Sequence, residues 1–390
     1  MIRIDRLHVE NFKSIKSLDL ELGPLNVLVG PNNAGKSNIL DCFGFLGDFV
    51  RDPDQAFQAR GGLRRVVRNG DSAQAIGMRF CGTWFQDRKG GKKKISEMQF
   101  EYEVKFLGHV SVSFILDREK LSLRNSGEVL LDGGATGEGS AQSQYVVIGG
   151  IHHQSRNPGQ SILAGLRYPT SGAHPLLIEF AQEINNWQTY SIIPLHAREP
   201  NEARLGLLMS PHGENLAQVL HSIFSEYPEI FKQIEELVQA AFPGVTALRS
   251  PLTTSGKTLV GTTEQSHQFL SGSLSEGTLR FLGVLATVYS PESSCVICIE
   301  EPENAIHPRA LQLLVDILRS RTERHQFVLT THSPYLVDLV RPEELTVVEK
   351  TITKGTVAKR ASKIRGTKEA IKSLGLGELW YSGHLGGVPQ

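Results

Sequence analysis

The stretch Gly30-Pro31-Asn32-Asn33-Ala34-Gly35-Lys36-Ser37 fills the pattern G-x-x-x-x-G-K-[ST]. The apolar run Asn26-Val27-Leu28-Val29 precedes it and predicts a buried strand, and the segment from Ser37 to Phe43 predicts the start of a helix. In such a loop, successive backbone N–H groups point inward at phosphate oxygens, the lysine reaches the β- and γ-phosphates, and the serine hydroxyl ligates Mg²⁺. The sequence therefore predicts an α/β P-loop fold that binds a nucleoside triphosphate through Lys36 and Ser37, with the helix N-terminus favouring the anion.

Composition limits the classes of protein that fit. The chain has 390 residues, 40% hydrophobic and 21% charged, which is typical of a soluble globular protein with two or three structural units. Its 41 basic and 41 acidic residues balance, so any surface for nucleic acid must be a local patch. Met1–Arg6 alternates charged and apolar residues, which is unlike a signal peptide, and no apolar run is long enough to cross a membrane. The four cysteines are too few for a disulfide framework in a chain of this size. We therefore expect a cytoplasmic protein without a membrane partner.

The order of segments predicts an ATPase head that is interrupted after its first half. Residues 1–50 read as three strands, the phosphate loop and a helix, and residues 51–172 change to short alternating runs separated by Gly-rich and basic turns. We expect four units: the N-terminal half of the head (1–50), an inserted β-rich lobe (51–172), a short helical and strand subdomain (173–265), and the C-terminal half of the head (266–390).

Two groups of basic residues lie in the predicted insertion and could meet a phosphate backbone. The alternative is that they form a solvated hairpin tip, and no aromatic residues are interleaved with them to stack on single-stranded bases. The first group is Arg60, Arg64, Arg65 and Arg68, and the second is Lys89, Lys92, Lys93 and Lys94.

Two adjacent carboxylates, Glu300 and Glu301, follow the apolar run Cys295–Ile299. Hydrolysis of a magnesium nucleotide needs one acid to hold the water shell of the metal and one to polarise the attacking water, and we assign Glu300 to the first task and Glu301 to the second. A helix dipole would explain one glutamate but not a pair that ends an apolar strand. His332 follows the strand-like run Gln326–Thr330, at the edge where ligands bind in open α/β sheets, so we expect it to reach the γ-phosphate.

A Ser-x-Gly turn, Ser275-Glu276-Gly277, precedes a predicted helix, Leu279–Tyr289. Taken alone it is an ordinary capped helix start that can bind an anion. The turn becomes stronger evidence for a nucleotide site because it lies ahead of the apolar run that ends in Glu300 and Glu301.

These motifs, in this order and with a large interruption after the first, resemble the ABC-type ATPases of the SMC/RecF/OLD branch. More narrowly, they resemble the AAA_21 group of ATPases, several of which are encoded beside nucleases in bacterial anti-phage modules. The matching stretches are Val9-Glu10-Asn11-Phe12-Lys13-Ser14, Gly30–Asn38, Leu274-Ser275-Glu276-Gly277-Thr278, Ile299–Pro308, Thr331-His332-Ser333 and Leu376-Gly377-Glu378-Leu379-Trp380. They cover both ends of the chain, and the middle carries no resemblance.

The resemblance implies a head-to-tail homodimer with two ATP molecules between the protomers. Ser275 and Gly277 of one subunit would close on the γ-phosphate that Lys36 of the other holds, and His307 would lie in the segment that crosses the interface. The remaining nucleotide-binding residues that it implies are Lys13 and Ser14 of the N-terminal hairpin, and Asn32, Asn33, Ala34, Gly35 and Asn38 of the phosphate loop and its helix.

The sequence departs from the pattern of the family in two places. Glu300 stands where most ABC ATPases have Asp, one methylene shorter, which bears on the geometry of the metal. Glu276 and Thr278 replace the Gly and Gln that are usual in the signature of transporters.

The function that the resemblance implies is an ATP-driven switch, in which closure of the heads gates double-stranded DNA or a separate effector such as a nuclease, in anti-phage defence or DNA repair. Two alternatives stay open at this point. One is a scaffold that binds ATP with little hydrolysis, and the other is the ATP-binding subunit of a transporter, against which the substituted signature and the large insertion argue.

Overall fold

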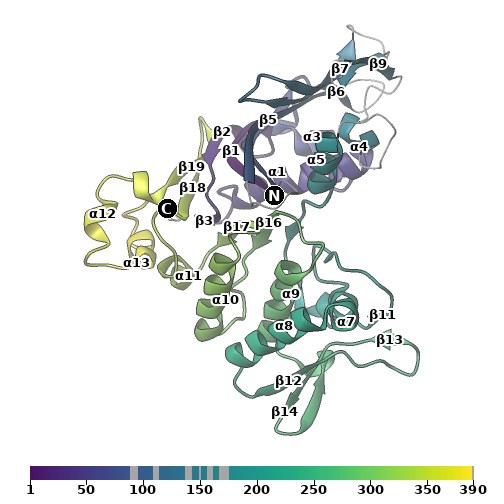
Figure 1. The fold of residues 1–390 in the computed structure, drawn as a ribbon. Helices are drawn as coiled ribbons and strands as arrows, with labels where there is room; N and C mark the ends of the chain where they lie inside the picture. The colour runs from purple at the N-terminus through teal and green to yellow at the C-terminus, as the bar shows by residue number, and fades with distance from the viewer. Residues whose placement is uncertain are drawn as a thin grey trace.

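The computed structural model describes residues 1–87, 95–108, 114–136, 143–148, 151–155, 161–166 and 175–388. Within them a 14-stranded sheet runs through the upper part of the molecule (Figure 1). In spatial order its strands are β10 (Thr189–Tyr190), β16 (Val296–Glu300), β17 (Gln326–Thr331), β3 (Leu25–Val29), β18 (Leu345–Thr351), β19 (Gly355–Arg360), β2 (Ile15–Glu21), β1 (Ile2–Phe12), β4 (Ile76–Asp87), β5 (Ile95–Gly108), β6 (Phe114–Leu123), β7 (Val129–Thr136), β8 (Ser143–Ile148) and β9 (Ile151–Ser155).

The strands from β10 to β18 pair in parallel, and this part of the sheet is buried on both faces. Successive side chains of a strand point to opposite faces. Leu28 therefore joins the core on one side of the sheet, whereas Val27 and Val29 join the core on the other. Such double burial explains why the strand sequences are continuous apolar runs rather than alternating ones.

The remaining strands pair antiparallel and extend the same sheet. Strand β4 pairs with β1, from Ile2 opposite Trp84 to Glu10 opposite Gly77, and each following strand pairs with the one before it. The segment predicted as an inserted β-rich lobe thus contributes strands that continue the sheet of the head from its β1 edge. The division of the chain into four units stays a prediction.

Helix α1 (Lys36–Arg51) lies in the core between the parallel and antiparallel parts of the sheet, and both parts share that core. Its phenylalanines stack edge-on with those of the antiparallel strands, for example Phe49 with Phe106 at 4.6 Å between ring centroids. Burial of large aromatic side chains supplies much of the stabilisation here. The other helical segments on this side are α2 (Pro53–Gln58), α3 (Leu63–Val66), η1 (Arg68–Gly70), α4 (Ile162–Leu166) and α5 (Pro175–Asn185).

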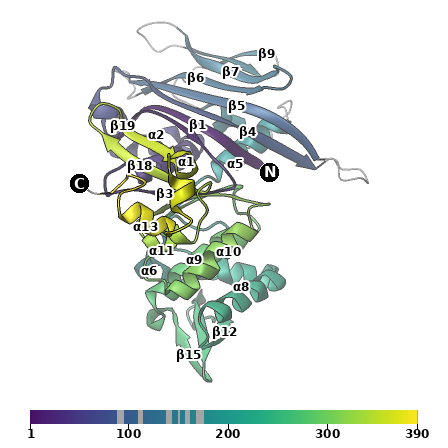
Figure 2. The ribbon, with the colours of Figure 1, turned by 90° about the vertical axis from the view of Figure 1, so that its left-hand side faces the viewer.

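A second core covers the opposite face of the parallel strands. Figure 2 shows the helices of this core below the sheet, with a small hairpin sheet at the far end. The helical segments are α6 (Pro194–Ala197), α7 (Leu216–Glu226), α8 (Pro228–Ala241), η2 (Ser271–Ser273), α9 (Glu276–Tyr289), α10 (Pro308–Ser320), α11 (Pro334–Asp338), η3 (Ala361–Lys363), α12 (Thr367–Ala370) and α13 (Leu376–Tyr381). The short strands are β11 (Asn201–Glu202), β12 (Val245–Arg249), β13 (Lys257–Thr258), β14 (Gly261–Glu264) and β15 (His267–Leu270).

Gln326, at the start of β17, is completely buried and ties β17 to the first strand of the chain. Its amide oxygen accepts from the Ile4 N–H at 2.9 Å, and its amide nitrogen donates to the Ile4 carbonyl at 2.6 Å and to the Gly23 carbonyl at 2.8 Å. A buried amide whose groups are all paired in this way fixes the register of distant strands.

The chain forms only a very short edge strand between α5 and α6. Only Thr189–Tyr190 forms a strand, and α6 begins at Pro194, because a proline fits the first turn of a helix but cannot donate to a sheet. No helix in the described part of the chain is long and apolar enough to cross a membrane.

Candidate nucleotide site

The ends of three parallel strands form the floor of the site. In β3, Val29 is the register partner of Thr331 in β17, and Glu300 of β16 is the partner of Thr330. The phosphate loop, the acid pair and His332 therefore leave the sheet at the same edge. This is the edge of an open α/β sheet at which ligands bind.

The phosphate loop has the backbone conformation that anion binding needs. Asn33 has φ of 64° and Gly35 has φ of 102°, so the chain turns through the left-handed region before α1 begins. No side chain caps the N-terminus of α1, which leaves the N–H groups of its first turn for an anion. Among the loop residues, Ala34, Gly35 and Lys36 are buried, and Asn32, Asn33 and Ser37 are exposed.

Lys36 points back across the loop. Its Nζ donates to the Gly30 carbonyl at 2.8 Å and to the Pro31 carbonyl at 3.1 Å, and it lies 2.9 Å from Nε2 of His332. Burial lowers the pKa of Lys36 to about 8, while the charges of the neighbouring glutamates oppose the shift. The amine is thus held close to the loop, and its cationic form is less favoured than in a solvent-exposed lysine. A bound polyphosphate would stabilise the cationic form.

Glu301 and His332 lie on one side of Lys36. His332 Nε2 is 3.5 Å from Glu301 Oε1, and Asn304 donates to Glu301 Oε2 at 2.8 Å. Burial and the Lys36 charge lower the pKa of His332, which favours the neutral imidazole. Glu301 has φ of 44°, in the left-handed region, so its carboxylate sits on a constrained turn. Glu300, half-buried at the end of β16, is close enough for its charge to act on Lys36.

Ser14, Asn38 and Thr356 join the N-terminal hairpin, α1 and β19 beside the loop. Asn38 donates to the Ser14 hydroxyl at 2.6 Å, that hydroxyl is 2.7 Å from the Thr356 hydroxyl, and Thr356 donates to the Ala34 carbonyl at 2.9 Å. A Cβ at Gly35 would overlap both hydroxyls. Sequence reasoning proposed Ser14 and Asn38 but missed Thr356, because nothing near it in the sequence marks it as a neighbour of the loop.

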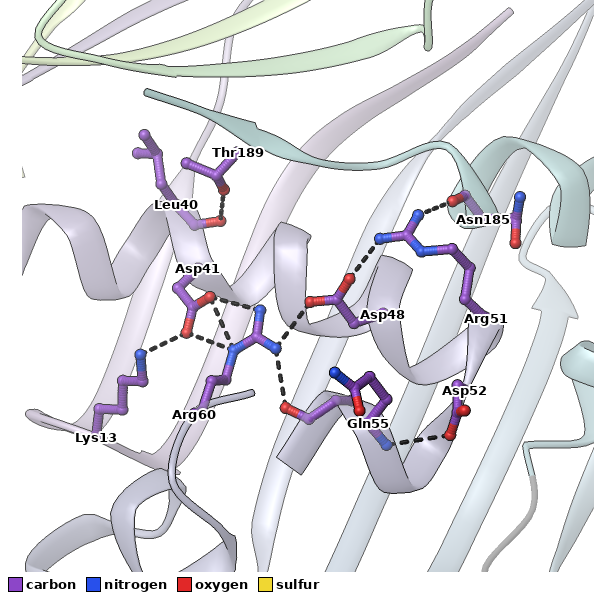
Figure 3. A network of polar contacts seen from close by, with 11 residues as sticks. Lys13, Leu40, Asp41, Asp48, Arg51, Asp52, Gln55, Arg60, Asn185 and Thr189 are labelled. Carbon is purple, nitrogen blue, oxygen red and sulfur yellow. Dashed lines mark hydrogen bonds and ion pairs between the residues drawn. The ribbon is translucent and has the colours of Figure 1, made fainter. Parts of the chain in front are cut away.

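Lys13 and Arg60 both bind Asp41 on α1 (Figure 3). Lys13 Nζ is 2.6 Å from Asp41, and Arg60 contacts Asp41 at 2.7 Å and Asp48 at 2.8 Å. The Arg60 side chain is only 11% exposed, so it is a structural cation and is not available to a DNA backbone, contrary to the sequence hypothesis. The approach of Lys13 to the nucleotide stays a prediction.

The other basic residues of that hypothesis have different outcomes. Arg68 donates to the Ser14 carbonyl at 2.9 Å, whereas Arg64 and Arg65 are exposed. The group Lys89, Lys92, Lys93 and Lys94 lies outside the described residues.

The Ser275 turn caps the N-terminus of α9. Ser275 is exposed, and its Oγ accepts from the Thr278 N–H at 3.1 Å. Gly277 is buried against the loop that follows Glu301, where a Cβ would lie 2.3 Å from the Ala305 carbonyl oxygen. His307 is exposed at the N-cap of α10, and its ring accepts from the Arg309 N–H at 3.3 Å. Within the described part of one chain, no hydrogen bond or ion pair joins Ser275 or His307 to the phosphate loop.

Comparisons with known proteins agree with this geometry. A family model described as "AAA domain, putative AbiEii toxin, Type IV TA system" matches residues 177–338, and one described as "AAA ATPase domain" matches residues 2–80. The chain is 35% identical over 82 residues to the DNA replication and repair protein RecF of Magnetococcus marinus, over 20% of this chain and 22% of that protein. It is 50% identical over 46 residues to an OLD nuclease of Thermus scotoductus, over 12% of this chain and 9% of that protein.

The alignments thus span less than a quarter of the length of either relative. Among solved structures, the SmcHead bound to the C-winged helix domain of ScpA superposes with a TM-score of 0.52 at 12% identity, covering 95% of this chain and 99% of that one. This likeness confirms the predicted α/β head fold. The two family models and the short relatives thus support an ABC-type ATPase of the SMC/RecF/OLD branch, and the likeness to the SmcHead supports the fold.

Proposed function

We propose that the protein is a homodimeric switch that closes on ATP and opens on hydrolysis. One observation carries the proposal: Lys36, Glu301 and His332 converge at the edge of the sheet, with Lys36 and Glu301 each within 3.5 Å of the imidazole. Transfer of a phosphoryl group to water requires a cation that binds the phosphates and a residue that positions the attacking water. The cluster contains both, together with a histidine at the end of a strand.

The residues present fit a magnesium nucleotide. The loop has an uncapped helix start and a glycine where a Cβ would overlap neighbouring hydroxyls, and Ser37 and Glu300 offer the oxygen ligands that Mg²⁺ prefers. When bound, the metal would neutralise charge on the phosphates. Glu301 would accept a proton from the attacking water, Lys36 would hold the β- and γ-phosphates, and neutral His332 would orient toward the γ-phosphate.

The dimer arrangement rests on the exposed signature. Ser275 presents its hydroxyl to solvent at the N-terminus of α9, and His307 presents its ring at the N-terminus of α10. Helix N-termini attract anions. We infer that Ser275 and Gly277 of one protomer complete the site around Lys36 of the other.

Two variants test the switch. Glu301→Gln removes the base but keeps the shape, so it should bind ATP, lose hydrolysis by about 100-fold or more and accumulate as a dimer. Lys36→Ala should lose ATP binding and stay monomeric with ATP. Turnover by malachite-green assay and mass by light scattering, each with and without ATP, read both effects. Hydrolysis by Glu301→Gln at the wild-type rate would refute the assignment of the base, and a wild type without turnover would leave a nucleotide-binding scaffold.

We propose that the switch gates DNA or a separate nuclease, in DNA repair or anti-phage defence. The support is that relatives by short alignment are named as a replication and repair protein and as a nuclease. ATP hydrolysis with and without linear double-stranded DNA, at low and near-physiological salt, tests which partner acts. Stimulation that falls with salt would indicate DNA on the heads, and an unchanged rate would indicate a protein effector.

A further inference from the structure

Glu303 lies in the loop between the acid pair and α10, and its carboxylate faces the turn that carries His332. Oε1 accepts from the Thr331 hydroxyl at 2.6 Å and from the His332 N–H at 3.1 Å. The Thr331 hydroxyl in turn accepts from the Ser333 N–H at 2.9 Å. One carboxyl oxygen therefore organises the backbone on both sides of the histidine.

The imidazole that this turn presents is placed between the two groups of the proposed reaction. His332 Nε2 is 2.9 Å from Lys36 Nζ and 3.5 Å from Glu301 Oε1. Its ring can keep both distances only while the backbone at His332 is fixed. A shift of about 1 Å in a positioned group costs catalysis on the order of 100-fold.

Glu303 also influences the signature helix α9, through its electrostatic effect on Arg280. Glu303 Oε2 and Arg280 Nε of α9 are both buried atoms without a hydrogen-bond partner among the residues that the structure describes. Burial lowers the pKa of the Arg280 guanidinium, and the charges of Glu276, Glu303 and Glu301 oppose that shift. The first turn of α9 also contacts this loop at Ala305, through Gly277. The loop that carries Glu303 thus lies between the signature helix and the histidine.

We propose that Glu303 is a positioning residue for hydrolysis, which acts through His332 by holding the 331–333 turn in the geometry that sets the imidazole between Lys36 and Glu301. It does not touch the nucleotide. The proposal rests on the proposed function, since it assigns Glu303 to the same hydrolytic site.

The test compares Glu303→Ala with Glu303→Gln. The amide oxygen of Gln can still accept from Thr331 and His332, so Glu303→Gln should keep kcat within about threefold. Glu303→Ala should lower kcat about tenfold or more while the Kd for ATP changes less than about twofold, because the phosphate loop is untouched. A double variant, Glu303→Ala with His332→Ala, should be no slower than His332→Ala alone, because Glu303 works only through the histidine.

Three outcomes would overturn the proposal: wild-type kcat in Glu303→Ala, equal losses in the Ala and Gln variants, or additive losses in the double variant. Hydrogen exchange at residues 331–333 in the nucleotide-free protein gives a readout that needs no turnover. Exchange should rise in Glu303→Ala and stay unchanged in Glu303→Gln. If the wild type does not hydrolyse ATP, the proposed function fails, but exchange still decides whether Glu303 holds the turn, and unchanged exchange in Glu303→Ala would refute that.

Discussion

Gly277→Ala is the substitution whose effect can be worked out most directly from the structure. A Cβ at Gly277 would lie 2.3 Å from the Ala305 carbonyl oxygen, where an ordinary contact is 3.4 Å or more. The helix start or the loop must therefore move by about 1 Å. Because that loop begins at Glu301, the shift reaches the proposed base, and we expect hydrolysis to fall on the order of 100-fold, or about 2.7 kcal/mol in the barrier.

Gly272→Ala is the matched control. It lies in the same stretch, and a Cβ there would meet no atom within 4 Å. Alanine favours helix over glycine by about 1 kcal/mol, so Gly277→Ala should still fold. Steady-state turnover, ATP affinity and thermal unfolding of the two variants separate a catalytic loss from a folding defect.

The refuting results follow from the same geometry. Turnover of Gly277→Ala within about twofold of wild type would show that the loop absorbs the Cβ without consequence. Turnover could also fall while hydrogen exchange in residues 301–307 of the nucleotide-free protein stays unchanged. The loss would then come from the contact that Gly277 makes with the nucleotide held by the partner protomer. In that case the reasoning through Ala305 would be wrong.

Three further perturbations test the neighbourhood of the site. The pKa of Lys36 in the nucleotide-free protein is about 8, and bound phosphates would raise it. The affinity for ATP without Mg²⁺ should therefore be constant below pH 8 and fall by up to about tenfold per pH unit above it. Calorimetry above pH 8 should also detect proton uptake when ATP binds. Arg60→Ala should lower the free energy of unfolding in urea by about 2 kcal/mol, because it removes a largely buried side chain and its ion pairs with Asp41 and Asp48, which keep Lys13 and Arg51 as partners. Exposed Arg65→Ala should cost less than about 0.5 kcal/mol. Thr356→Val should weaken ATP binding about fivefold through the loop carbonyl it holds, and exposed Thr353→Val should not. Level affinity through pH 9, an Arg60→Ala as stable as Arg65→Ala, or unchanged binding by Thr356→Val would each contradict its prediction.

The phosphate loop and its flanking elements could be predicted from the sequence because their chemistry is local. Gly35 lies at a positive φ that glycine adopts without strain, next to the lysine and serine that use the turn. The strand before it and the helix after it were expected within a residue or two of β3 and α1. The acid pair at the end of β16 could be predicted for the same reason, because the apolar run and the carboxylates that follow it are adjacent in the sequence.

Other parts of the site depend on contacts between distant segments, which no local pattern reports. Thr356 reaches Ala34 because β18 inserts beside β3 and turns into β19, a pairing that the sequence does not mark. Glu303 was quoted within a matching stretch, yet its role needs the position of Thr331, which the register of β17 sets. Arg60 was grouped from its charge with residues that could meet a phosphate backbone, and only the fold shows that Asp41 and Asp48 pair with it.

The topology also explains how a long segment can interrupt the head without disturbing the site. The strands that carry the site, β16, β17 and β3, are consecutive in the sheet, whereas β4 to β9 extend the sheet from β1, on the far side of β18, β19 and β2. The entropy of closing a loop grows only with the logarithm of its length, so the chain returns from β9 to β10 at modest cost. What must be preserved is the link between the two parts, and Gln326 provides it by bonding β17 to Ile4 on β1. The catalytic edge is therefore set by the parallel strands, by Gln326 and by Thr356 of β19, whereas none of the site residues described above lies on strands β4 to β9.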